Sequence, residues 1–245
     1  MGPTGRSPRV AGREICVGLV YLDKHRAEES PGRGALLERR YVTALEDREG
    51  FWKQLHAAAR AVGVLDQETI VRLSDGGAYF IEHSNELLRD QPLVEILDIQ
   101  HARQHVWEAG AEVQTDKDSR ERWVKPFLGM IAAGHIKTLL ATLAAKRGGL
   151  SGKKQCEAVR KLIGYVERHQ HMMDYPSYNA AGYPIASGAI ESANKRLVGR
   201  RCKQGGMIWS VPGLEHMCAL RSALLNTEPW GRLWPHASDP RRAAA

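Results

Sequence analysis

The segment 182–204, which reads GYPIASGAIESANKRLVGRRCKQ, places one acid ahead of a run of cations. Glu191 falls in the first turns of a predicted helix, where the helix dipole favours a negative charge. Five cations follow with no acid among them: Lys195, Arg196, Arg200, Arg201 and Lys203. A carboxylate at the head of a cationic helix indicates a metal-binding acid beside a phosphate-binding surface.

Two features of the same segment locate the start of this helix. Pro184 disfavours the helical conformation at Tyr183, so the chain is expected to be extended there. A serine oxygen at Ser187 can accept a hydrogen bond from an unpaired backbone N–H of a first helical turn. We therefore predict that the helix begins at residues 187–188.

Two aspartates follow predicted strands. Asp75 comes after the strand 69–74 and precedes two glycines, and Asp98 comes after the strand 93–97. Taken alone, each is more typical of a turn or a helix cap than of a metal ligand. Their position at two neighbouring strand ends, with Glu191 on a later helix, favours the metal-binding interpretation.

His101 and His105 lie on the helix predicted after Asp98, in the pattern D-x-x-H-x-x-x-H. This spacing puts the three residues on one helix face, which could bind a divalent metal or supply hydrogen bonds around one. The zinc pattern H-E-x-x-H is not met, because Ala102 follows His101. A helix-capping aspartate with two structural histidines explains the spacing equally well.

The cationic run also has a simpler explanation, since most charge runs are solvated helix faces. Two observations favour a binding role instead. The cations recur at helical spacing, and Trp209 follows them, with an indole that could stack on a base. Trp209 is also a candidate for the core, as are Trp107 and Trp123.

The elements that must position these residues follow from apolar periodicity. Strands are predicted over 14–22 and 40–45, paired as a hairpin across a charged loop over 23–38, and a helix over 46–62. A strand over 69–74, a helix over 78–89 and a strand over 93–97 form a parallel β-α-β unit. This arrangement places Asp75 and Asp98 at the edge where open α/β sheets hold their sites.

The remainder is predicted to be helical. Residues 99–174 form a helical segment that breaks near the glycines of 148–152, and a last amphipathic helix spans 211–226. We accordingly divide the chain into five parts: a disordered N-terminus (1–13), a strand-rich core (14–101), a helical insertion (102–180), a C-terminal helical part (181–234) and a loose tail (235–245).

Composition indicates a globular protein with an anionic partner. The 245 residues carry a net charge of +7, and the pI is about 9.3, a balance typical of proteins that bind nucleic acid. Four scattered cysteines without a C-x-x-C pair argue against a disulfide framework and a zinc ribbon. Without a secretory signal or an apolar stretch of membrane-spanning length, we expect a cytoplasmic protein with no membrane partner.

Four motifs, in this order, resemble one family. They are LSDGGAYFI (73–81), EILDIQHARQHVWE (95–108), YPIASGAIESANKRLVGRRCKQGGMIWS (183–210) and ALRSALLN (219–226). Together they resemble the ISKra-type insertion-sequence transposases, which belong with the mutator-like DDE transposases. The resemblance covers the chain from about Glu14 to Trp234.

The resemblance implies an α/β fold with an RNase H-like mixed sheet and an all-helical insertion before the last catalytic acid. It implies that Asp75 is the second catalytic aspartate and Glu191 the catalytic glutamate, and that both bind metal. Asp98 and His101 match an auxiliary motif that follows the second acid. The DNA-binding residues would then be Lys195, Arg196, Arg200, Arg201, Lys203 and Trp209.

The implied chemistry is DNA transposition, by Mg²⁺-dependent strand cleavage and strand transfer, with Mn²⁺ as a substitute metal. Two metals about 3.5–4 Å apart can activate a water or a 3′-hydroxyl and stabilise the leaving oxygen. The implied partners are DNA at the element ends and at the target, and a homo-oligomer is compatible with them.

One part of the family pattern has no counterpart here. The first catalytic aspartate of the family lies in a D-G-T-like motif, upstream of the strand that matches 14–22. Residues 1–13 contain no aspartate, and Asp23 follows that strand, so it cannot take this place. We therefore expect a truncated, inactive copy whose sheet lacks its first strand, because catalytic carboxylates act as a unit.

Two other functions fit the same residues. A non-catalytic DNA-binding remnant could regulate transposition by competing for element ends. A metal-dependent nuclease or phosphohydrolase could complete its site with another acid, such as Asp98.

Overall fold

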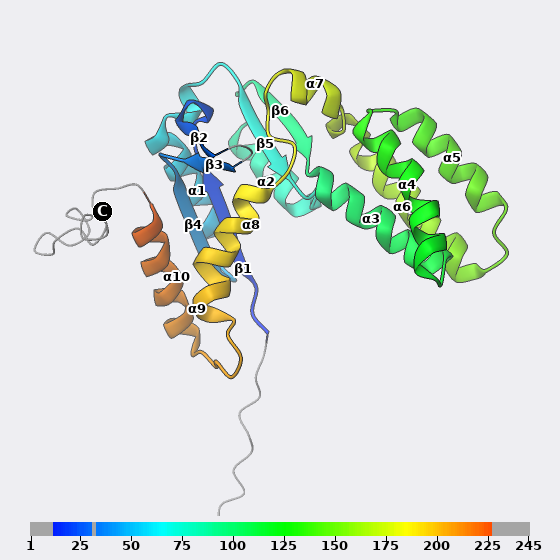
Figure 1. Cartoon of the computed structure of the whole chain (residues 1–245). Helices are drawn as coiled ribbons and strands as arrows, with labels where there is room; N and C mark the ends of the chain where they lie inside the picture. The colour runs from blue at the N-terminus through cyan, green and yellow to red at the C-terminus, as the bar shows by residue number, and fades with distance from the viewer. Residues whose placement is uncertain (1–11, 31–32, 227–245) are drawn as a thin grey trace, which may run out of the picture. The chain divides into compact units, whose positions relative to one another are not determined.

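The computed structural model describes residues 12–30 and 33–226 (Figure 1). The chain is a mixed α/β protein that divides into two compact units. The first contains the described parts of 1–67 and 188–245, and the second contains 68–187. The second unit is therefore one continuous segment inserted between two halves of the first.

An antiparallel strand pair forms the centre of the first unit. Strands β1 (Ile15–Val20) and β4 (Arg40–Leu45) pair along their whole length, which confirms the predicted hairpin with a long connection. Successive side chains of β1 point to opposite faces. One face meets helix α1 (Arg48–Val62) so closely that a Cβ added to Gly18 would lie 2.7 Å from Cδ1 of Leu55.

Helix α1 begins and ends at residues suited to those positions. Asp47 caps its first turn, with Oδ1 accepting a hydrogen bond from the Gly50 N–H at 2.8 Å. Gly63 ends it in the left-handed conformation, at φ 80°, which glycine adopts at low cost. A short 3₁₀ turn, η2 (Val64–Asp66), follows.

The segment between β1 and β4 is structured, and the predicted loop over 23–38 is wrong. A 3₁₀ turn, η1 (Asp23–His25), leads into strands β2 (Arg26–Ser30) and β3 (Arg33–Leu36), which pair with each other antiparallel. The prediction failed because it depended on apolar alternation, and the β2 sequence RAEES has none. Backbone hydrogen bonds form a ladder without such a pattern.

Helices from the C-terminal half cover the other face of β1 and β4 (Figure 1). They are α8 (Gly188–Asn194), a π-helical turn η4 (Lys195–Gly199), α9 (Arg200–Cys202) and α10 (Val211–Leu225). The helix start at 187–188 and the last helix are thus confirmed to within one residue. Their shared core with the strands is apolar: Tyr41, Ala193, Leu197, Val198, Cys202 and Cys218, with Ile15, Val17 and Leu19 packed against it.

The second unit begins with the predicted β-α-β unit. Strands β5 (Ile70–Ser74) and β6 (Leu93–Leu97) are parallel and are joined through helix α2 (Ala78–Leu87). Ser74 lies opposite Leu97, so the residues that follow them, Asp75 and Asp98, leave the same edge of the pair.

The helices of the second unit are α3 (Ile99–Val113), α4 (Lys117–Ala132), α5 (Ile136–Gly148), α6 (Lys153–His169), a 3₁₀ turn η3 (Gln170–Met172) and α7 (Tyr175–Ala180). The predicted break near the glycines of 148–152 is confirmed. A second break, between α4 and α5, was not predicted, and Gly134 makes it at φ 68°. The core that these helices form with β6 includes fully buried side chains: Ile96, Leu97, Val106, Phe127, Leu139, Leu143 and Tyr175.

The described strands pair two by two, as β1–β4, β2–β3 and β5–β6, and not as one continuous mixed sheet. Within the described ranges, none of the helices is long and apolar enough to span a membrane. The predicted disordered N-terminus and loose tail lie outside the described residues, apart from Gly12 and Arg13.

Candidate functional site

Asp75 lies on a tight turn after β5. Its carboxylate is exposed, and Oδ1 accepts a hydrogen bond from the Gly77 N–H at 3.0 Å. Gly76, between them, has φ 84°, a conformation that a residue with a Cβ adopts only under strain. Among the described residues no other group pairs with the carboxylate, so its second oxygen is available to a cation.

Asp98 is bound quite differently at the end of β6. It is only 3% exposed. Oδ1 accepts from the Gln100 N–H at 2.7 Å and caps α3, and Oδ2 accepts from the N–H of Ser187 at 3.3 Å and from its hydroxyl. Its backbone N–H donates to the Ser74 carbonyl at 2.8 Å. The carboxylate therefore links α3 to the segment that precedes α8, and the backbone N–H of the same residue binds the end of β5.

His101 and His105 lie on one face of α3, as their spacing predicts. Their rings are 5.7 Å apart between centroids, in an edge arrangement. The His105 ring also contacts the Tyr165 ring, tilted with 4.0 Å between centroids, and its Nδ1 is 3.2 Å from a Glu108 carboxylate oxygen. Burial lowers the pKa of His105, and the Glu108 charge opposes this only in part.

Sequence reasoning missed three aromatic residues near the two aspartates: Tyr165, His169 and Tyr175. Burial raises the pKa of Tyr165, and the negative charges of Asp75 and Asp98 raise it further. Burial also raises the pKa of the fully buried Tyr175. Both phenols are therefore protonated at neutral pH, and neither hydroxyl has a hydrogen-bond partner among the described residues. Helical periodicity placed Tyr165 and His169 on a helix, but it carries no information about the contact between that helix and the turn at Gly76.

Glu191 belongs to the first unit, in the first turn of α8. It is exposed, while Ala193, two residues on, is fully buried against β1 and β4. The helix thus presents its acid to solvent and packs its small residue inside. The carboxylates of Asp75 and Glu191 are in different units, and each is free to act as an oxygen ligand.

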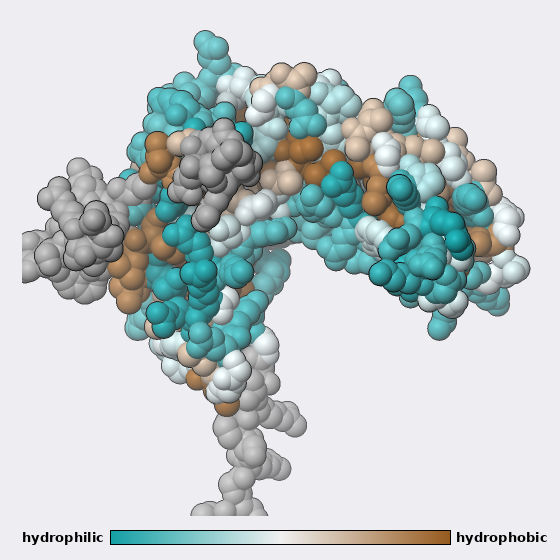
Figure 2. Space-filling view, in the orientation of Figure 1, coloured by the Kyte–Doolittle hydropathy of each residue, from teal (hydrophilic) through white to brown (hydrophobic). Residues whose placement is uncertain are grey.

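The predicted cations form an exposed surface on the turns that follow Glu191. Lys195, Arg200, Arg201 and Lys203 are exposed and Arg196 is half-buried. Within residues 12–30 and 33–226, none of the five forms an ion pair with a carboxylate. Hydrophilic side chains gather over α8 and α9 in Figure 2.

Arg221, on α10, binds the backbone of the turn that carries part of this cationic surface. Its Nε donates to the carbonyl oxygens of Arg196 and Leu197, at 2.9 and 3.0 Å. These carbonyls belong to the π-helical turn, where the ordinary hydrogen-bond ladder is interrupted. Burial lowers the pKa of Arg221, and the positive charge of Arg201 lowers it further. The surface therefore concentrates positive charge.

Trp209 is half-buried beside the first turn of α10, where its ring faces Gly213. Its Nε1 is buried and has no hydrogen-bond partner in the described part of the chain. Of the two other tryptophans singled out from the sequence, Trp107 is 39% exposed, and Trp123 packs edge-on against Phe127 in the core of the second unit.

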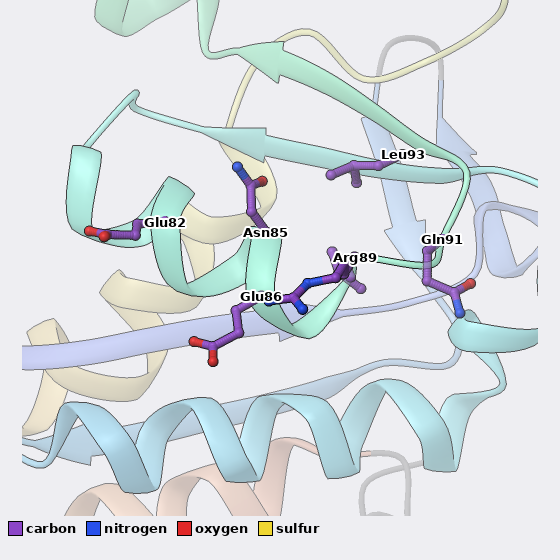
Figure 3. Close-up of a pocket in the computed structure, with 7 residues that line it drawn as sticks. Glu82, Asn85, Glu86, Arg89, Gln91 and Leu93 are labelled. Atoms are coloured by element: carbon purple, nitrogen blue, oxygen red, sulfur yellow. The ribbon is translucent and has the colours of Figure 1, made fainter.

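A pocket of about 550 Å³ lies in the second unit, at the end of α2 and the start of β6 (Figure 3). None of the residues singled out from the sequence lines it. Its lining combines polar and charged residues with two leucines: Glu82, Asn85, Glu86, Leu88, Arg89, Gln91 and Leu93.

Of the three acids considered as metal ligands, two have carboxylates that can bind a metal and one does not. Asp75 and Glu191 are exposed carboxylates of the kind that Mg²⁺ prefers. Asp98 is unsuitable, because three donors already occupy its oxygens. In the part of the chain that the structure describes, no three His, Cys, Asp or Glu residues cluster as a metal site.

Comparison of the chain with family models, curated proteins and solved structures finds no match.

Proposed function

We propose that this chain acts in DNA transposition, as part of the catalytic core of a DDE transposase that binds DNA through the cationic surface formed by η4, α9 and Lys203. The observation that carries the proposal is that surface itself: five cations without carboxylate partners among the described residues, next to an exposed acid. Unpaired cations at helical spacing suit a row of backbone phosphates, and not a structural network.

The metal-binding part of the proposal concerns Asp75 and Glu191. These two carboxylates would hold Mg²⁺, and the bound metal would supply Lewis-acid activation at a phosphodiester. Asp98 would act indirectly, by fixing the strand end next to Asp75. We further propose an RNase H-like fold for the chain, to which the four sequence motifs point.

The second candidate function is a non-catalytic DNA-binding regulator of transposition. It is favoured by one observation, that three donors already occupy the oxygens of Asp98, the acid at the strand end next to Asp75. Because catalytic carboxylates act as a unit, we expect DNA binding without strand cleavage from this chain by itself.

The test is equilibrium binding of the full chain to labelled duplex DNA, measured by fluorescence anisotropy over a range of salt concentrations. The variant exchanges Lys195, Arg196 and Arg200 for Gln. Each cation that contacts a phosphate contributes about 0.9 to the slope of log affinity against log salt. We expect the variant to lose about two to three units of slope and at least tenfold in affinity at low salt.

The matched control exchanges Lys153, Lys154 and Lys161 on α6 for Gln, which removes the same charge from another exposed surface. The proposal is wrong if both triple variants bind equally well. A parallel incubation with Mg²⁺ or Mn²⁺ separates the two functions: cleavage that Asp75→Asn and Glu191→Gln abolish supports the enzyme, and binding without cleavage supports the regulator.

A further inference from the structure

The turn that carries Asp75 is contacted by a side chain from the far end of the helical segment. His169 is the last residue of α6, lies 93 positions further along the chain than Gly76, and is only 3% exposed. Its Nε2 is 3.0 Å from the Gly76 carbonyl oxygen. Its Nδ1 is 2.9 Å from the Tyr165 carbonyl oxygen, one helical turn earlier.

The contact is close as well as polar. A Cβ added to Gly76 would lie 2.7 Å from the His169 Nε2 and 2.9 Å from Cδ1 of Leu97. The turn is thus enclosed between the imidazole and the end of β6. The Tyr165 ring also contacts the His169 ring, tilted by 54° with 4.6 Å between centroids, and this contact further restrains the imidazole.

We propose that His169 is a positioning residue for Asp75, through its hydrogen bond to the Gly76 carbonyl. This inference rests on the proposed metal-binding role of Asp75, and it gives the helical segment a part in the site. A carboxylate on an exposed turn would otherwise sample several directions, and ordering it only on metal binding would weaken the affinity. The bond from the Gly77 N–H holds the Asp75 side chain, and the His169 contact holds the Gly76 carbonyl. Together they restrict the orientation of the Asp75 carboxylate.

Two substitutions separate the hydrogen bond from the packing. His169→Gln retains an amide donor at nearly the same reach, whereas His169→Leu retains apolar volume without a donor. His171→Gln is the matched control, because His171 is an exposed histidine two residues away. Circular dichroism of the full-length chain establishes that each variant is folded.

The first measurement is amide hydrogen exchange at Gly76 and Gly77 in the metal-free chain. One buried hydrogen bond corresponds to roughly a two- to tenfold change in local opening. We expect His169→Leu to speed exchange at these two amides by that factor, His169→Gln to restore most of the protection, and His171→Gln to match the unchanged chain. Equal exchange in His169→Leu and His171→Gln overturns the inference.

The second measurement is Mn²⁺ binding, detected by electron paramagnetic resonance, with Asp75→Asn defining the share due to Asp75. We expect His169→Leu to lower the Mn²⁺ affinity of the Asp75-dependent site by roughly the same two- to tenfold factor. We expect His169→Gln to recover that affinity. Mn²⁺ binding that Asp75→Asn leaves unchanged contradicts the proposed function, while the exchange result still decides the role of His169. In the unsubstituted chain, a His169 ring Nε2–H that exchanges rapidly with solvent would also overturn the inference.

Discussion

Glu95→Gln is expected to destabilise the chain by about 3 kcal/mol, more than Arg72→Met does. Arg72 and Glu95 lie opposite each other on β5 and β6 and form an ion pair. The arginine side chain is 4% exposed and the glutamate side chain 26%. The Arg72 Nη1 also donates to the Ile81 carbonyl at 3.2 Å, and to Ser84 and Asn85 of α2.

The two substitutions differ in the charge that each leaves without a partner. Breaking a buried pair costs about 3–5 kcal/mol when an unpaired charge remains. Glu95→Gln leaves the buried Arg72 cation with neutral acceptors only, so its cost falls at the lower end of that range. Arg72→Met leaves Glu95, which reaches solvent and lies 3.7 Å from the His171 imidazole, so we expect only about 1–2 kcal/mol.

The assay is urea denaturation of the full-length chain, followed by circular dichroism, with both single variants and the double variant. Because the residues are in contact, the double variant should cost at least 1 kcal/mol less than the sum of the single ones. The reasoning fails if Arg72→Met costs as much as Glu95→Gln, or if the two costs simply add.

Three further predictions concern other parts of the chain. Gly18→Ala should destabilise the first unit by about 1–2 kcal/mol in the same denaturation assay, because the new methyl group would press on Leu55; an unchanged midpoint would contradict this. Because the pKa of His105 is lowered in the folded chain, the imidazole takes up a proton in the unfolded chain first as pH falls. The stability that the buried neutral imidazole contributes is therefore complete above about pH 7 and is lost as pH falls below about 6.5. Melting temperatures of His105→Gln and the unchanged chain should therefore converge on acidification, and a parallel decline would refute the assignment. Arg221→Leu should weaken duplex binding more than Lys203→Gln, which removes the same charge, because it also frees the carbonyls of η4; equal losses in the anisotropy titration would show that Arg221 acts only by its charge.

The strands that carry a buried face were predictable from sequence. β1, β4, β5 and β6 each contain enough apolar residues to signal a half-buried or buried strand. β2 and β3 were not, because a hairpin of charged and small residues looks like a loop when only apolar alternation is considered. The same reasoning applies to the break at Gly134, since one glycine in a helical pattern is compatible with a continuous helix.

Some residues of the candidate site were also predictable from sequence, and others were not. Asp75, Asp98 and the cations of η4 and α9 were identifiable because motif and spacing are local properties of the chain. The role of Asp98 was left open, and only its bonds to Ser187 and Gln100 reveal a carboxylate that is fully occupied. His169 gave no signal at all, because it acts on a turn 93 positions earlier in the chain.

The insertion of the second unit into the first affects how the protein is made. β1, β4 and α1 leave the ribosome early, so α1 can pack against one face of the strand pair at once. The opposite face, with Val17 and Leu19, is covered by α8 and α10, which are synthesised only after the whole second unit. During that interval the nascent chain carries a bare apolar sheet face, the kind of surface that aggregates or recruits a chaperone. Translation speed across residues 68–187 therefore sets how long the growing chain remains vulnerable.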